Sequence, residues 1–334
     1  MRFAKLTLTT RRFPGLVATG VAVLALSACS SSSLPTLNGF AAVREQAART
    51  ESAASDRATQ LAEVATDCAS CSAALRAVAS ASHERLEALG GLWDPWGGTP
   101  PEGASAPAAV SEAPTDVSAF VAWLARTATR DLEIAADTNR TSADEARTLS
   151  AAALGRYASA VTIAQAYGID LDAGLDQALL VNDRVNAASR QGVQTWSIDL
   201  FDAPGISASF DPSGKDLASS QELSSAVATW DCTASTLPQA QVSAGTLSDA
   251  YAVSGELLAR ADVALRAGAA DTRTPRCTLG FLDAPSLASN LLAADSAMLA
   301  SNSSDVRAAG ASAALADIQQ WAPRTSLPAL IGTR

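Results

Sequence analysis

Two cysteines three residues apart, Cys68 and Cys71, have the clearest capacity for chemistry in this sequence. Cysteines at this spacing can form a thiol–disulfide exchange centre, because a cysteine at a helix N-terminus has a lowered pKa and reacts as a thiolate. Such centres normally stand in a βαβ unit, and the surrounding sequence predicts none. We interpret the pair as a structural disulfide and keep a thiol-redox enzyme as the alternative function.

The single histidine, His83, lies close to Glu84 and Glu87 and could serve as a ligand or a base. A di-iron bundle requires two Glu-x-x-His motifs, which this chain lacks. Asp170 and Asp172 precede a glycine but lack the remaining ligands of a calcium loop. There is also no phosphate loop and no Gly-x-Ser-x-Gly motif. We expect no metal and no cofactor, and we place His83 on the surface.

Trp93 and Trp96 flank Asp94-Pro95 in a stretch rich in Gly and Pro. Two indole rings at this spacing can stack on a sugar or contact a protein partner. They can equally close one end of a helical bundle beneath a long loop. We favour the second interpretation and keep a ligand or partner contact as the alternative.

Residues 1–28 have the three parts of a secretory signal peptide. Basic residues precede the uncharged run 13–26, which is shorter than the roughly 20 residues of a membrane span. The sequence Leu26-Ser27-Ala28-Cys29 resembles the lipobox of bacterial lipoproteins. The resemblance implies cleavage before Cys29 and attachment of diacylglycerol to its thiol. The alternatives are an ordinary signal peptide with an incidental cysteine, or an uncleaved anchor.

The export route is left open by Arg11-Arg12-Phe13, which is similar to a twin-arginine signal but lacks the usual residue before Phe. We favour general secretion. Residues 29–37, rich in serine, then form a short polar tether behind the lipidated cysteine. The expected location is the extracytoplasmic face of the cell membrane.

Four cysteines remain after Cys29, and an even number in an exported chain favours disulfides. They allow three connectivities. We expect Cys68–Cys71 and Cys232–Cys277, because each pair lies in its own half of the chain. The second pair would close a loop of about 46 residues, a stabilisation on the order of 4 kcal/mol in the chain-entropy model.

Composition excludes some partners. Four of the 24 basic residues and none of the 34 acidic residues lie in 1–28, so the remaining chain has a formal net charge of −14. A chain this acidic lacks the basic face that nucleic acid requires. It is also repelled by anionic lipid, so the lipid chains must supply the anchoring. An envelope protein partner stays possible.

Abundant Ala, Leu, Glu, Gln and Arg, with 5% aromatic residues, predict an all-α fold. We expect eight to nine helices in antiparallel bundles. The strongest apolar stripe, between 117 and 132, follows Thr115 as its cap, and Ser142 with Glu145 forms a capping box. Later helices are expected at 216–230, 240–267, 285–301 and 304–321.

We divide the chain into four parts: the signal peptide 1–28, the tether 29–37, an N-terminal helical bundle 38–190 and a C-terminal helical region 191–334 packed on it. The stretch 191–215 is the least helical and is left as an irregular segment. In the last region, one apolar face is formed by Leu247, Tyr251, Leu258 and Leu265.

Residues 83–95 are similar to a segment found in actinobacterial lipoproteins of unknown function, some of which carry a ferritin-like helical domain. The resemblance implies an Ala-rich bundle and no known activity. We expect a membrane-anchored lipoprotein that acts as a non-catalytic binding or structural module. The alternative is an envelope thiol-redox enzyme that uses Cys68 and Cys71.

Overall fold

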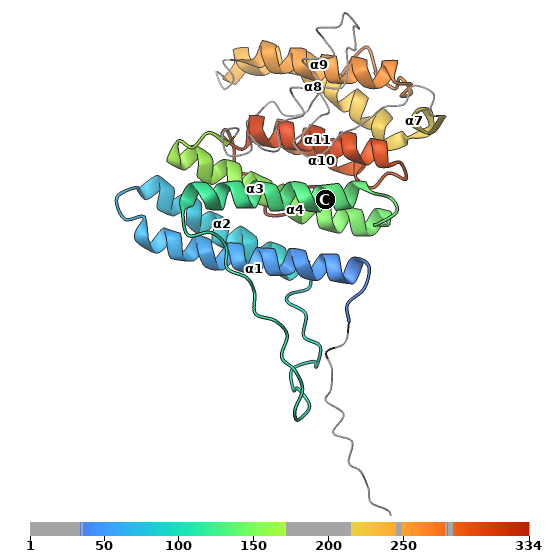
Figure 1. The fold of residues 1–334 in the computed structure, drawn as a ribbon. Helices are drawn as coiled ribbons and strands as arrows, with labels where there is room; N and C mark the ends of the chain where they lie inside the picture. The colour runs from blue at the N-terminus through green and yellow to red at the C-terminus, as the bar shows by residue number, and fades with distance from the viewer. Residues whose placement is uncertain are drawn as a thin grey trace, which may run out of the picture.

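The computed structural model describes residues 34, 36–171, 215–244, 249–277, 279 and 283–333, and these residues form helices and no strands. The irregular segment expected near 191–215 falls almost wholly outside them. The prediction of an all-α bundle of eight to nine helices is confirmed (Figure 1), since the described ranges contain α1 (Phe40–Val64), α2 (Ala69–Ala88), α3 (Val117–Ala136), α4 (Ala143–Tyr167), α7 (Lys215–Ser219), α8 (Gln221–Ala244), α9 (Ala250–Arg266), α10 (Ala284–Met298) and α11 (Ser304–Trp321).

The long helices pair into four hairpins that stack as layers, and the order of the layers differs from the order of the chain (Figure 1). The hairpin α1–α2 packs on α3–α4 through α2 and α4. The last hairpin, α10–α11, lies between α3–α4 and α8–α9, because α11 contacts α3 and α4 while α10 contacts α8. The early and late parts of the chain therefore share one continuous apolar core.

The ends of α3 and α4 follow local sequence rules. Asp116, one residue after the predicted cap Thr115, caps α3 by accepting a hydrogen bond from the Ala119 amide at 2.8 Å. The capping box of Ser142 and Glu145 is confirmed at the start of α4. Gly168 ends α4 in the left-handed conformation, with φ at 66°, which costs glycine little because it lacks a Cβ.

Helix α8 corrects one predicted boundary. We expected a break between 230 and 240, but α8 continues through Pro238. Proline has no amide hydrogen, so the carbonyl of Ala234, four residues earlier, loses its helical donor. The hydroxyl of Ser254 on α9 donates to that carbonyl at 2.6 Å. A neighbouring helix thus satisfies the group that the proline leaves unpaired.

Helix α9 presents a different face to the core from the one its largest apolar residues suggest. Tyr251 is 72% exposed and Leu258 is 45% exposed, Leu265 is half-buried and packs against the core, and Leu247 lies outside the described residues. The opposite face is buried instead, with small and medium residues that allow close packing on the neighbouring helices: Val253, Leu257, Ala261 and Ala264.

Buried Arg307 joins α11 to the turn between α3 and α4. Its Nη1 donates to the carbonyl oxygens of Ala135 and Thr141, each at 3.1 Å. Nearby, the Ser304 hydroxyl lies 2.8 Å from the Thr138 hydroxyl. These polar contacts fix the last hairpin against the N-terminal helices, because a buried guanidinium must keep its acceptors.

Candidate functional site

The two expected disulfides are present. Cys68 and Cys71 are joined with their Cα atoms 5.2 Å apart, and Cys232 and Cys277 are joined with theirs 5.4 Å apart. Both separations suit a disulfide. The second bond links α8 to the segment that follows α9, as the pairing by halves of the chain predicted.

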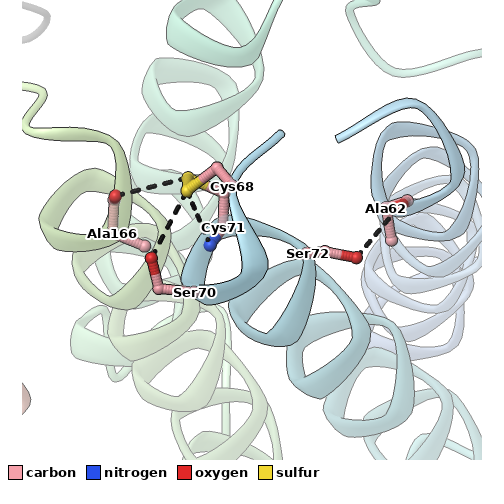
Figure 2. The surroundings of a disulfide bond; sticks show 6 residues. All are labelled: Ala62, Cys68, Ser70, Cys71, Ser72 and Ala166. Carbon is pink, nitrogen blue, oxygen red and sulfur yellow. Dashed lines mark hydrogen bonds between the residues drawn. A yellow bond between two sulfur atoms is a disulfide. The ribbon is translucent and has the colours of Figure 1, made fainter. Parts of the chain in front are cut away.

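Cys68 is the N-cap of α2, a position that Ser, Thr, Asp or Asn normally occupies. Its Sγ accepts a hydrogen bond from the Cys71 amide at 3.1 Å and lies 3.3 Å from the Ser70 hydroxyl (Figure 2). The Cys71 side chain points inward, towards the Ala166 carbonyl on α4. Cys68 is half-buried, while Cys71 is only 3% exposed.

A cleft of about 390 Å³ opens between α2, α4 and the C-terminal segment 322–329. Its helical walls carry small side chains, among them Ala81 and Ala158, together with the hydroxyls of Ser159 and Thr162. The C-terminal segment contributes further hydroxyls at Thr325 and Ser326. The cleft is thus lined by mixed apolar and hydroxyl groups and lies between the N-terminal helices and the end of the described chain.

The C-terminal segment is seated on α4 by its backbone. The Ile331 amide donates to the Ala151 carbonyl at 3.2 Å, and the Ile331 side chain is buried. The Ala329 carbonyl lies directly over Gly155, at a place where a Cβ would overlap it. Glycine is required at this point of α4 because the backbone of the segment approaches too closely for any side chain.

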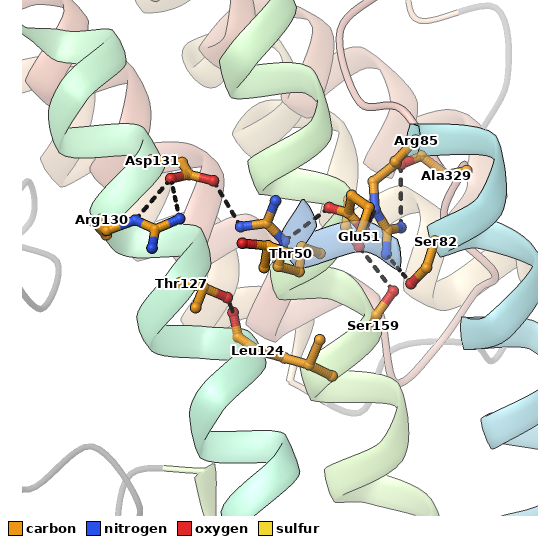
Figure 3. Close-up of polar contacts among 12 residues, drawn as sticks. Thr50, Glu51, Ser82, Arg85, Leu124, Thr127, Arg130, Asp131, Ser159 and Ala329 are labelled. Carbon is orange, nitrogen blue, oxygen red and sulfur yellow. Dashed lines mark hydrogen bonds and ion pairs between the residues drawn. The ribbon is translucent and has the colours of Figure 1, made fainter. Parts of the chain in front are cut away.

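Arg85 connects the cleft to a buried network of charges (Figure 3). Its Nε donates to Glu51 at 2.9 Å, and its Nη1 lies 3.5 Å from the Ala329 carbonyl. The other Glu51 oxygen accepts from Arg156 Nε at 2.8 Å, and Arg156 Nη1 donates to Asp131 at 2.7 Å. Arg130, at the surface, completes the chain of pairs on Asp131.

Three members of this network, Glu51, Arg85 and Arg156, are fully buried. Burial, together with the nearby charge of Arg156, lowers the pKa of Arg85, and Glu51 opposes that change. Burial also disfavours the charged form of Arg156, but Glu51 and Asp131 outweigh it and raise its pKa. The shared carboxylate thus keeps two guanidinium groups charged inside the protein.

Sequence reasoning did not identify this network. Glu51, Asp131, Arg85 and Arg156 lie on four different helices and match no spacing motif. One signal was present in α4, where small and apolar residues surround Arg156 on every side of the helix. A charged residue in a helix that is apolar all round must be buried with a partner.

The remaining predicted residues lie away from the cleft lining. Trp93 and Trp96 are half-buried in the loop after α2, where the Trp93 amide donates to Glu45 on α1 at 2.7 Å. His83 is exposed, as expected, and lies 3.4 Å from Glu87. Cys29 and the whole of 1–33 lie outside the described residues.

Within the described ranges, no three His, Cys, Asp or Glu side chains come together as a metal site. In the same ranges, every helix is too short or too polar to cross a bilayer. No protein-family model, curated protein or solved structure matches the chain.

Proposed function

We propose that this chain is a lipoprotein anchored to the extracytoplasmic face of the cell membrane through Cys29, and that its cleft acts as a binding site rather than as a catalytic site. The lipobox-like sequence 26–29 supports the anchor. Because α1 begins at Phe40, an extended tether over 29–37 would keep the helical body within about 30 Å of the bilayer.

The cleft between α2, α4 and segment 322–329 is the observation that carries the binding function. Its volume of about 390 Å³ lies in the range of small-molecule sites. Its lining combines Ala and Gly surfaces with hydroxyl groups and the edge of Arg85. We propose a small ligand with both apolar and hydrogen-bonding groups as its occupant.

The anchor is tested by replacing Cys29 with Ser and following the protein in cell fractions. We expect the wild-type N-terminus to carry a diacylglyceryl group by mass spectrometry and to stay with the membrane. Cys29→Ser should stay unprocessed or leave the membrane fraction. An unmodified wild-type chain, or equal membrane retention of the variant, would overturn the anchor.

The binding site is tested by native mass spectrometry of protein released from its own membranes in mild detergent. Ala81→Trp would fill the cleft, whereas Ala88→Trp places the same side chain on an exposed position of the same helix, outside the cleft. We expect a bound small molecule on wild type and on Ala88→Trp, and its loss from Ala81→Trp. If all three proteins carry the same mass, or none carries any, the cleft is not the binding site.

A further inference from the structure

The two cysteines at the start of α2 differ in their exposure to solvent. Cys68 is the N-cap and is half-exposed, while Cys71 is buried against α4. An incoming sulfur can therefore reach Cys68 far more readily than Cys71. The disulfide Cys232–Cys277 differs from this one in loop length, because its cysteines are 45 residues apart in the sequence, whereas Cys68 and Cys71 are 3 apart.

The surroundings of Cys68 favour a thiolate. The Cys71 amide at 3.1 Å and the Ser70 hydroxyl at 3.3 Å can both donate to its Sγ (Figure 2). The first turn of α2 contains no acidic side chain, so the positive end of the helix dipole has no other negative partner on the helix itself. A sulfur released as a thiolate at this N-cap would supply one.

The short disulfide also contributes less to the fold than the long one. A ring closed over three residues removes much less freedom from the unfolded chain than a loop closed over 45. Helix α2 also packs on α1 and α4 along its length, so opening the Cys68–Cys71 bond leaves the packing of the helix in place.

We propose that Cys68 and Cys71 form a thiol–disulfide exchange site that oxidises a dithiol in a partner polypeptide, with Cys68 as the attacked sulfur and Cys71 as the buried second sulfur. This proposal goes beyond the binding function and does not depend on the lipid anchor. Redox exchange is a catalytic step in its own right, and it uses a different part of the molecule from the cleft.

The exchange balances in two steps. A partner thiolate attacks Cys68 Sγ, forms a mixed disulfide and releases Cys71 as a thiolate, which takes up a proton. A second partner thiolate then attacks the partner sulfur of the mixed disulfide and releases Cys68 as a thiolate, the leaving group that the helix N-terminus stabilises. The partner dithiol loses two electrons and becomes a disulfide, and Cys68 and Cys71 become a dithiol. The reverse exchange with a second, disulfide-bearing protein restores the starting bond.

The test uses the folded full-length chain and graded concentrations of dithiothreitol, with alkylation and peptide mass spectrometry to score each disulfide. We expect Cys68–Cys71 to open at concentrations that leave Cys232–Cys277 intact. After reduction, iodoacetamide should modify Cys68 at least about tenfold faster than Cys71, with a half-maximal rate at a pH below about 8.5, the ordinary value for cysteine. Equal resistance of the two disulfides, or faster alkylation of Cys71, would overturn the proposal.

A second test of the exchange site traps the mixed disulfide with a peptide. Cys71→Ser should accumulate a mixed disulfide through Cys68 with a peptide that carries a single cysteine, after the variant is activated with an aromatic disulfide, because neither Cys71 nor a second peptide thiol can then release the peptide. Cys68→Ser should give at most about a tenth of that product, and the pair Cys232→Ser with Cys277→Ser should behave as wild type at Cys68. Circular dichroism shows whether each variant is folded. If Cys68→Ser traps the peptide as well as Cys71→Ser does, Cys68 is not the attacked sulfur.

Discussion

The two parts of the molecule both bury charges, but they balance them differently. Among α1–α4, the carboxylates of Glu51 and Asp131 face two buried arginines, with Arg130 at the edge. In the second cluster, among α8–α11, Arg260 lies with two buried carboxyl groups, those of Asp317 and Asp295. The four buried groups of the first cluster sum to zero charge when all are ionised, and the partly exposed Arg130 adds a solvated positive charge, whereas the second cluster has one carboxyl group in excess.

The excess carboxyl group of the second cluster is that of Asp295. Arg260 pairs with both oxygens of Asp317, each at 3.1 Å, and its guanidinium lies 5.4 Å from the centre of the Trp230 ring. Trp230 Nε1 donates to one Asp295 oxygen at 2.8 Å. Burial and the neighbouring carboxylate of Asp317 raise the pKa of Asp295 well above its ordinary value, and Arg260 only partly opposes them.

The comparison indicates that the stability contributed by a buried charge network varies with pH when its charges do not sum to zero, and is independent of pH when they do. Paired ions stay charged across the neutral range. An unpaired carboxyl group must bind a proton as the protein folds, so it couples stability to pH. Four predictions compare the two parts of the molecule, in order of decreasing effect on stability.

Glu51→Gln should be the most damaging change. It removes the negative charge shared by Arg85 and Arg156, both fully buried, and breaking a buried pair from one side typically costs about 3–5 kcal/mol. Urea unfolding followed by circular dichroism measures the loss. The control is Glu87→Gln, which removes an exposed carboxylate next to His83 and should change stability by less than about 1 kcal/mol. Similar losses in the two variants would show that the network does not stabilise the fold.

Glycine-to-alanine changes should lower the free energy of unfolding in the N-terminal part and raise it in the C-terminal part. Gly155→Ala places a Cβ on the Ala329 carbonyl and should displace the C-terminal segment from α4, at about 1–3 kcal/mol. Gly255→Ala on α9 meets no atom within 4 Å and should stabilise its helix by about 0.5–1 kcal/mol. Urea unfolding measures the change in the free energy of unfolding for each variant. Limited proteolysis after Arg324 should become faster only in Gly155→Ala, and unchanged proteolysis would count against the seating of the segment.

Asp295→Asn should remove the pH dependence of the second cluster. The folded protein binds a proton at Asp295 that the unfolded chain releases above about pH 4, so this residue makes the wild type less stable as the pH rises towards the raised pKa. The slope is at most about 1.4 kcal/mol per pH unit. Asparagine keeps the acceptor for Trp230 and does not titrate. The stability of Asp295→Asn relative to wild type should therefore increase from pH 4 to pH 8 in urea unfolding.

Asp317→Asn is the companion to that experiment. It removes the ion pair with Arg260 and also the carboxylate that helps raise the pKa of Asp295. It should therefore destabilise the protein most at low pH, where Asp295 is protonated and Arg260 has no counter-charge. If the difference between Asp295→Asn and wild type is constant between pH 4 and pH 8, then Asp295 does not bind the excess proton.

The smallest expected effect concerns the hydrogen bond between the Ser254 hydroxyl on α9 and the Ala234 carbonyl on α8. Ser254→Ala leaves the Ala234 carbonyl, already without its helical donor, unpaired inside the protein and should cost about 1 kcal/mol. In a Pro238→Ala background the restored amide can donate to that carbonyl, so the cost of Ser254→Ala should shrink. A thermodynamic cycle of the four proteins by urea unfolding measures the coupling, and a cost that is unchanged by Pro238→Ala would contradict this account.

Local features were predictable because they depend on neighbouring residues. The helical composition and the Ser142–Glu145 capping box were both predicted from short stretches. The predictions failed where a distant helix intervenes. The helix break expected between 230 and 240 is absent, and the sequence does not show that Ser254 on α9 meets the Ala234 carbonyl. The apolar face expected at Tyr251 and Leu258 is exposed, because α9 packs through the smaller residues of its other face.

The helical class, the capping box of Ser142 and Glu145, the favoured pairing of the cysteines and the lipobox-like segment from which the anchor is proposed could all be predicted along the sequence. Composition, spacing and local hydrogen bonds act over a few residues, so they can be read along the chain. Only the tertiary structure decided that the last hairpin lies inside the stack, and that Glu51, Arg85, Arg156 and Asp131 meet beside a cleft. Those contacts join residues from four helices, and burial, which gives them their strength, is a property of the packed molecule alone.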